Sequence, residues 1–251
     1  GEVMSIAPSF EQAIMKAVRG AEIGLDTLNN KALKGVDIKQ KLHDQDDIRL
    51  FTVFKALKEG VSIAEIHDIT MIDEWFLAKL DNLARYELEI EGKPLSKEQY
   101  LKGKKLGYPD KALEKISGGS LTYHRDCVYK MVDTCGAEFK AETPYFYSTY
   151  DEHCEARELD KNDRKKIIVL GSGPIRIGQG IEFDYSCVHC VWTLKELGYE
   201  VIIINNNPET VSTDFDTGDR LYFEPLTDED VMNVIKAENP IGVVVAFGGQ
   251  T

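Results

Sequence analysis

Residues 166–185 read KIIVLGSGPIRIGQGIEFDY. An apolar, β-branched run opens this stretch and leads into a loop that carries Gly171, Gly173, Gly178 and Gly180. The residues after the loop enter a helical pattern. This order predicts a strand, a ligand-facing loop and a helix, because a parallel α/β sheet presents such loops at the carboxyl ends of its strands. Glycine suits the loop, since it accepts positive φ and allows close approach of the backbone.

The loop differs from both common nucleotide-binding motifs. It lacks the Gly-Lys-Ser/Thr ending of a P-loop. The dinucleotide fingerprint fails because Arg176 stands three residues after Gly173, and because asparagines follow the next predicted strand in place of a ribose-binding acid. Glu182 and Asp184 come directly after the loop and would repel a polyphosphate, since charges act over about 8 Å at physiological salt. The loop is therefore predicted to be a poor nucleotide cradle.

The C-terminal third alternates between strand and helix patterns. Strands are predicted at residues 166–170, 201–204, 221–223 and 243–246, with helices near residues 185–197 and 228–238. This alternation implies a parallel sheet with right-handed crossovers.

Helix signals dominate before residue 159. Ser62 with Glu65 and Ser96 with Gln99 mark helix starts, and apolar residues at helical spacing predict the longest amphipathic helix at residues 72–89. The run LDKNDRK at residues 159–165 is polar and charged, which is typical of a linker. The predicted fold class is therefore mixed, with an irregular all-α domain followed by a small α/β parallel-sheet domain.

Charge and cysteine usage argue against several classes of protein. The net charge of -13 gives a global field that repels nucleic acid and anionic membranes. No apolar run reaches the roughly 18 residues that a membrane-spanning helix needs. The five cysteines are odd in number and scattered, and no secretory signal is present. That combination favours reduced thiols and a cytoplasmic location.

Three long motifs carry a family resemblance. Besides the glycine loop, the chain contains NNNPETVSTDFDTGDRLYFEPLTDEDV at residues 205–231 and GVVVAFGGQT at residues 242–251. In this order they closely resemble the carbamoyl-phosphate synthetase large-chain family over residues 165–251. The opening residues 1–20 look like the end of that family's first ATP-grasp half. The middle, at roughly residues 26–150, is similar to its oligomerisation domain, most recognisably at residues 130–152.

The resemblance implies a domain plan. Residues 1–20 would be the tail of the first ATP-grasp half, residues 21–158 the helical oligomerisation domain and residues 159–164 a linker. Residues 165–251 would be the Rossmann-like pre-ATP-grasp subdomain of the second half. The chain lacks an initiator methionine and stops where the family's second grasp begins, so we expect an internal fragment.

The resemblance also implies an activity for the complete protein. The family is an ATP-dependent carbon–nitrogen ligase that makes carbamoyl phosphate from bicarbonate and ammonia, the ammonia coming from glutamine, for arginine and pyrimidine biosynthesis. Its cofactors are ATP with Mg or Mn, and we expect none in this fragment. The implied partners are the glutaminase small chain and other large chains in a homo-oligomer, with no nucleic acid and no membrane. The fragment alone is expected to be inactive.

Two glutamates are the leading candidates for a site. Glu182 and Glu209 follow the first and second predicted strands, so both should project from the same carboxyl edge of the sheet. By resemblance they line the internal tunnel that carries carbamate between the two active sites. The other predicted lining residues are Gly171, Gly173, Arg176, Gly178, Gly180, Asn205, Asn207 and Thr210. No catalytic residue and no metal ligand is predicted.

Each candidate also has a structural interpretation. The glycines could serve only tight strand-to-helix turn geometry, and Glu182 could merely complement a helix N-terminus. Arg176 could meet an anion in transit or form a salt bridge with a carboxylate. The asparagines could form an Asx turn toward Pro208, which is compatible with a site role.

Several other patterns favour packing over chemistry. Cys187 and Cys190 flank His189, but no second C-x-x-C exists, so small apolar packing residues explain them better than a metal or redox centre. The other histidines, His43, His67, His124 and His153, share no ligand spacing. The aromatic cluster at residues 145–150 is interpreted as a packing surface. A dinucleotide-binding oxidoreductase fragment and a non-catalytic helical interaction module remain as alternative functions.

Overall fold

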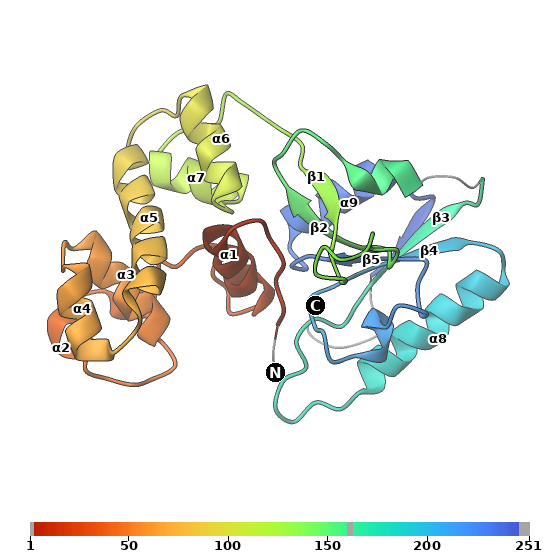
Figure 1. The fold of residues 1–251 in the computed structure, drawn as a ribbon, viewed down its shortest axis with the longest axis horizontal. Coiled ribbons are helices and arrows are strands. Elements are labelled where there is room, and N and C mark those ends of the chain that lie inside the picture. Colours follow the sequence, from red (N-terminus) through yellow and green to blue (C-terminus); the bar gives the residue numbers. More distant parts are fainter. Residues whose placement is uncertain (1–2, 160–162, 246–251) are drawn as a thin grey trace. The chain divides into compact units, whose positions relative to one another are not determined.

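The computed structural model describes residues 3–159 and 163–245. These residues form two compact units. The helical unit comprises residues 9–18 and 23–124. The sheet unit comprises residues 3–8 and 19–22 together with the described residues from 125 onward. Figure 1 shows the helices of the first and the sheet of the second.

The helical unit is built from short helices around one long one. Helix α5 (Glu74–Ile90) is the longest, and its buried Leu77, Leu80 and Leu83 pack into a core shared with the buried face of α3. The predicted helix at residues 72–89 is thus confirmed to within two residues at its start. The other helices are α1 (Phe10–Gly20), α2 (Ile38–Lys41), α3 (Arg49–Lys58), α4 (Ile63–Thr70), α6 (Lys97–Lys105) and α7 (Asp110–Ser117), with a 3-10 turn η1 (Lys31–Leu33).

Side chains cap these helices as the sequence predicts. The Ser62 hydroxyl accepts from the backbone N–H of Glu65 at 3.2 Å. At α6 the Ser96 hydroxyl accepts from the Gln99 N–H at 3.2 Å, while the Gln99 side chain accepts from the Ser96 N–H at 3.0 Å. This reciprocal pair satisfies two N–H groups that a helix start leaves without partners.

The sheet unit holds a six-stranded, mostly parallel sheet in the order β1-β2-β5-β4-β3-β6. Strands β2, β5, β4, β3 and β6 run parallel, and β1 joins β2 antiparallel. The strands are β1 (Val128–Met131), β2 (Tyr145–Thr149), β3 (Lys166–Leu170), β4 (Glu200–Asn205), β5 (Arg220–Phe223) and β6 (Gly242–Val244), with α8 (Glu182–Glu196), α9 (Asp228–Glu238) and the 3-10 turns η2 (Glu155–Leu159) and η3 (Val211–Thr213). The predicted helical-then-α/β fold class is confirmed, and part of the last predicted strand lies beyond the described residues.

Alternate residues of the central strands face different helices. Val201 and Ile203 of β4 pack in the same core as Cys187 and Val191 of α8. Ile202 and Ile204 pack instead with Val234 of α9. Helices α8 and α9 therefore cover opposite faces of the sheet, and Cys187 acts as the packing residue that the sequence suggested (Figure 1).

Strands β1 and β2 differ from the prediction, which placed residues 125–158 in a helical domain. Phe146 of β2 stacks on Tyr222 of β5 with ring centroids 5.3 Å apart, and Tyr129 of β1 meets the same ring at 4.8 Å. Both strands are short and neither shows a long alternating pattern. Strand β2 pairs with β5, which lies far away in the sequence, and β1 pairs with β2, so local patterns fail to reveal their extended state.

A buried arginine holds η2 against this sheet. Arg220 of β5 lies 2.8 Å from the Glu200 carboxylate and 3.1 Å from that of Glu238. Its guanidinium also donates to the carbonyls of Ala156 at 3.1 Å and Leu159 at 3.3 Å. The planar fork of arginine can reach several acceptors at once, so one side chain connects β4, β5, α9 and η2.

Candidate functional site

Asn205 organises the carboxyl edge of β3 and β4. It is the last residue of β4, and its side chain is fully buried. Its Oδ1 accepts from the backbone N–H groups of Gly173 at 3.1 Å and Asn206 at 2.9 Å, while Nδ2 donates to the Ser212 hydroxyl at 3.2 Å. The loop after β3 and the loop after β4 are therefore tied to one amide.

Two of the glycines are required by their surroundings. A Cβ at Gly171 would lie 2.6 Å from Nδ2 of Asn205, so no larger residue fits there without displacing the asparagine. Gly173 has a φ of +65°, and a Cβ would lie 2.7 Å from Oε1 of Glu22. The turn-geometry interpretation therefore applies to both, and neither faces open space.

Asn207 and Thr210 are also buried and hold the loop after β4. Asn207 Oδ1 accepts from the backbone N–H of Glu209 at 3.0 Å, which is the Asx turn over Pro208 that the sequence left open. Asn207 Nδ2 donates to the Gly173 carbonyl at 3.4 Å. The Thr210 hydroxyl lies 3.3 Å from the Asn207 carbonyl. These side chains connect loops to each other and present little of themselves to solvent.

The carboxylates separate into exposed and buried groups. Glu182 and Glu209 are exposed, and Glu182 Oε1 accepts from the Gly180 N–H at 3.4 Å at the start of α8. Asp184 is buried, and its Oδ2 accepts from the N–H groups of Val211 at 2.9 Å and Ser212 at 3.4 Å. Sequence reasoning treated Asp184 only as a repulsive charge and missed its role in fixing η3 to α8.

Arg176 pairs with a carboxylate far away in the sequence. Its Nη2 donates to the carbonyl of Glu22 at 3.1 Å and lies 3.4 Å from the Glu22 carboxylate. Of the two interpretations of Arg176, the salt bridge describes the contact in the structure. Glu22 itself was missed, because no local motif connects residues 22 and 176.

Three amides of the glycine loop are engaged with the protein's own acceptors. The N–H of Gly171 donates to the Ile204 carbonyl at 2.8 Å, that of Gly173 to Asn205, and that of Arg176 to the Gln179 side chain at 2.9 Å. A phosphate cradle instead directs unpaired amides at its ligand. The amides of Gly171, Gly173 and Arg176 are therefore not directed at a ligand.

No group of three or more histidine, cysteine, aspartate or glutamate side chains within residues 3–159 and 163–245 is arranged to hold a metal ion. Across the same residues, no helix is both long and apolar enough to cross a membrane.

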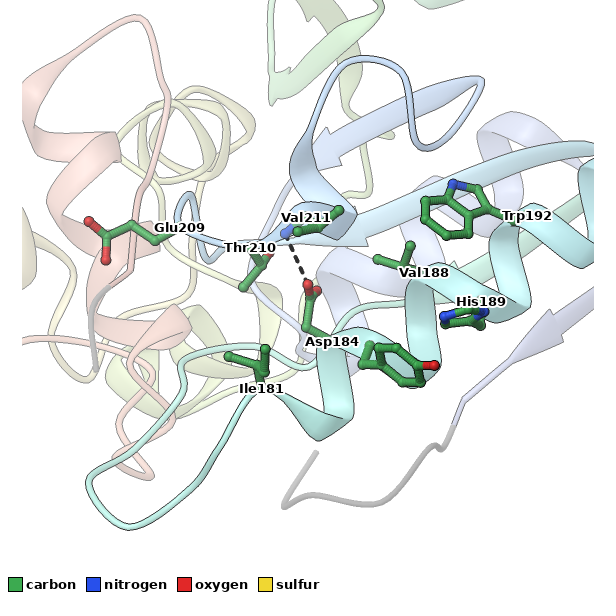
Figure 2. A pocket seen from close by; sticks show the side chains of 9 residues that line it. Ile181, Asp184, Val188, His189, Trp192, Glu209, Thr210 and Val211 are labelled. Atoms are coloured by element: carbon green, nitrogen blue, oxygen red, sulfur yellow. Dashed lines mark hydrogen bonds between the residues drawn. The ribbon is translucent and has the colours of Figure 1, made fainter.

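An apolar hollow of about 220 Å³ lies beside α8. The rings of Tyr185, His189 and Trp192 follow one another along this helix, with centroids 4.2 and 5.3 Å apart. Figure 2 shows the Glu209 carboxylate pointing away from these rings. The hollow is lined by Ile181, Asp184, Tyr185, Val188, His189, Trp192, Glu209, Thr210 and Val211. Its mainly apolar wall does not suit a small anion.

Two family models match the chain. Residues 2–131 match the carbamoyl-phosphate synthetase large chain, oligomerisation domain, and residues 163–251 match the carbamoyl phosphate synthase preATP-grasp domain. The chain belongs to the carbamoyl-phosphate synthetase large-chain family. The resemblance in the motifs is thereby confirmed, and the oxidoreductase alternative has no support.

Curated large chains of carbamoyl phosphate synthase are similar over the whole chain. That of Caldanaerobacter subterraneus subsp. tengcongensis is 52% identical over 262 residues, covering 100% of this chain and 24% of its own length. That of Archaeoglobus fulgidus is 47% identical over 270 residues, covering 100% and 25%. The chain therefore spans about a quarter of the length of these relatives.

The family domains and the compact units of this chain have different boundaries. The oligomerisation-domain match ends at Met131, which is the last residue of β1 in the sheet unit. Residues 3–8 and 19–22 also fall within that match and belong to the sheet unit. Residues matched to one family domain thus complete the fold of the other.

Proposed function

We propose that this chain acts as part of the large chain of a glutamine-dependent carbamoyl-phosphate synthetase. The complete enzyme would use ATP, bicarbonate and ammonia from glutamine to form carbamoyl phosphate. Support comes from the two family matches, which follow each other in the order expected for a large chain. Within it, the helical unit would contribute association with other large chains and the sheet unit would line the passage for carbamate.

The passage assignment rests on one observation. Glu182 and Glu209 are exposed carboxylates that follow the neighbouring parallel strands β3 and β4, Glu182 as the first residue of α8 and Glu209 in the loop after β4. The residues beneath them, Asn205, Asn207 and Thr210, are buried and hydrogen-bonded. We therefore divide the predicted lining set by exposure: the two glutamates would meet passing molecules, and the buried residues would keep their backbone in place.

The two lining glutamates would position passing molecules and would not react with them. A carboxylate at the carboxyl edge of the sheet would order water and accept hydrogen bonds from passing molecules that carry a donor, without attacking carbamate. ATP with its magnesium would be bound elsewhere in the complete enzyme, since the amides of Gly171, Gly173 and Arg176 are engaged internally. We accordingly expect this chain alone to show no ATP turnover.

Charge reversal at the two glutamates tests the passage. In the complete large chain paired with its glutaminase subunit, Glu182→Lys and Glu209→Lys should raise the glutamine hydrolysed per carbamoyl phosphate formed. Glu196→Lys is the matched control, because Glu196 is also exposed on α8 but lies at its opposite end. A ratio equal to that of the control would remove both glutamates from the passage.

A further inference from the structure

Glu22 adopts a backbone conformation that glutamate rarely accepts. Its φ is 53°, in the left-handed region where a Cβ approaches the following carbonyl. Glycine or asparagine would adopt this conformation with less strain. Such strain persists only where surrounding contacts impose it, and at Glu22 these contacts lead to the glycine loop.

The contacts of Glu22 involve both its backbone and its side chain. Arg176 Nη2 donates to its carbonyl at 3.1 Å and lies 3.4 Å from its carboxylate. The carboxylate also fills the space above Gly173, where a Cβ would lie 2.7 Å from Oε1. The Glu22 side chain is only 18% exposed, so the ion pair is partly shielded from water and from salt.

Glu22 is the end of a short segment that touches three separate parts of the carboxyl edge. Arg19 Nε pairs with the Asp230 carboxylate at 3.1 Å in the first turn of α9. The Gly20 carbonyl accepts from Asn206 Nδ2 at 3.0 Å in the loop after β4. Glu22 reaches Arg176 in the loop after β3. Residues 19–22 thus contact the loop after β3, which leads to Glu182, and the loop after β4, which carries Glu209.

We infer that residues 19–22 position the glycine loop, and that Glu22 is a positioning residue for the candidate site. A loop with four glycines loses much conformational freedom when it is ordered, so it needs fixed contacts. Asn205 holds the start of the loop through Gly173, and Glu22 holds its middle through Arg176. These two contacts direct the rest of the glycine loop, through Gly180 to Glu182, toward the carboxyl edge of the sheet. The positioning role itself is argued from these contacts. Its link to the carbamate passage rests on the proposed function.

Hydrogen exchange measures this positioning directly in the chain itself. In Glu22→Gln and Arg176→Gln, amides of residues 173–180 should exchange several-fold faster than in the unaltered chain. The double variant should exchange no faster than Arg176→Gln alone, because that substitution already removes the donor to both the carbonyl and the carboxylate of residue 22. Glu196→Gln is the control and should leave the loop unchanged.

A second variant separates the carboxylate from the backbone strain. Asparagine accepts the left-handed conformation but is too short to keep the carboxylate contact, so Glu22→Asn should fold well and still release the loop. Unaltered exchange in Glu22→Asn and in Arg176→Gln would overturn the inference. Faster exchange in the loop would support it.

The complete enzyme distinguishes the inference from the proposed function. If Glu22→Gln frees the loop but Glu182→Lys and Glu209→Lys leave the ratio of glutamine hydrolysed to carbamoyl phosphate formed at the control value, the positioning role stands and the passage assignment fails. If the loop keeps its protection while Glu182→Lys raises the ratio, the passage stands and the role of Glu22 fails.

Discussion

The side chain of Asn205 occupies the space in which a Cβ of residue 171 would lie, with Nδ2 2.6 Å from that position. The two residues end neighbouring strands, since Gly171 follows β3 and Asn205 closes β4. The absence of a side chain at one position is therefore what allows the buried amide at the other.

Gly171→Ala should destabilise the sheet unit. The new methyl group would displace Asn205 from a closely packed site, and overpacking of this kind costs about 1–3 kcal/mol. Chemical denaturation followed by circular dichroism measures the loss. Gly242→Ala in β6 is the matched control, because a Cβ there meets nothing within 4 Å. Equal stability of the two variants would contradict the steric relationship.

Asn205→Ala should cost more, at about 2–6 kcal/mol. It leaves the buried N–H groups of Gly173 and Asn206 without their acceptor, and each unsatisfied buried donor costs about 1–3 kcal/mol. Combining it with Gly171→Ala should cost less than the sum of the two, because the shortened side chain makes room for the methyl group. Strict additivity in the denaturation midpoints would show that the two residues do not compete for space.

The Cys187 thiol should make stability depend on alkaline pH. Burial, with a smaller effect of the Asp184 charge, raises the pKa of Cys187 from 9.0 to about 12. The folded state therefore favours the neutral thiol, and its contribution is complete below pH 9 and is lost as the pH rises toward 12. The expected slope is up to about 1.4 kcal/mol per pH unit.

Cys187→Ala identifies the source of that slope. Between pH 9 and 10 the variant should lose less stability per pH unit than the unaltered chain, although its stability below pH 9 is lower. The pKa values of the buried tyrosines Tyr86, Tyr108, Tyr129 and Tyr222 are also raised by burial, from 10.0, so their contribution to the slope begins at higher pH. Parallel curves from pH 9 to 10 would contradict the assignment.

Arg220→Met should be among the most damaging substitutions in the sheet unit. It leaves Glu200 and Glu238 buried without their guanidinium partner, and breaking a buried pair costs about 3–5 kcal/mol. Arg220→Lys keeps the charge but cannot reach all the acceptors, so we expect a loss of about 1–3 kcal/mol. Thermal unfolding measures both.

The control for Arg220 is Arg164→Lys. Arg164 lies 3.0 Å from Asp219, but its side chain is 41% exposed. An exposed pair contributes about 0–1 kcal/mol, so this conservative change should have little effect. A loss as large as that of Arg220→Lys would show that burial is not what distinguishes the two arginines.

Elements that depend on local sequence patterns were predicted correctly from the sequence. The apolar run at residues 166–170 and the helical spacing at residues 72–89 identified β3 and α5 with nearly correct bounds. Both segments carry the apolar residues that become buried, so their own sequence is enough to identify them. Glu182 and Glu209 are exposed, and their place in a passage stays a prediction.

The sequence did not reveal what depends on distant partners. Asn205 lies in a run of three asparagines, which gives no sign that its amide turns inward to join two loops. Glu22 and Arg176 are 154 residues apart, and β2 is extended because it pairs with β5. Each of these features depends on contacts that form only in the folded sheet.

Strands β1 and β2 carry a practical consequence for dissecting the protein. A truncation that begins at residue 163, where the second family match starts, would remove both strands. The backbone of β5 would then lose its partner β2 on one side and keep β4 on the other. Tyr222 would then lose the rings of Tyr129 and Phe146. Unpaired, apolar sheet edges recruit other chains, so such a piece should aggregate, whereas the chain that keeps β1, β2 and residues 3–22 should remain monodisperse.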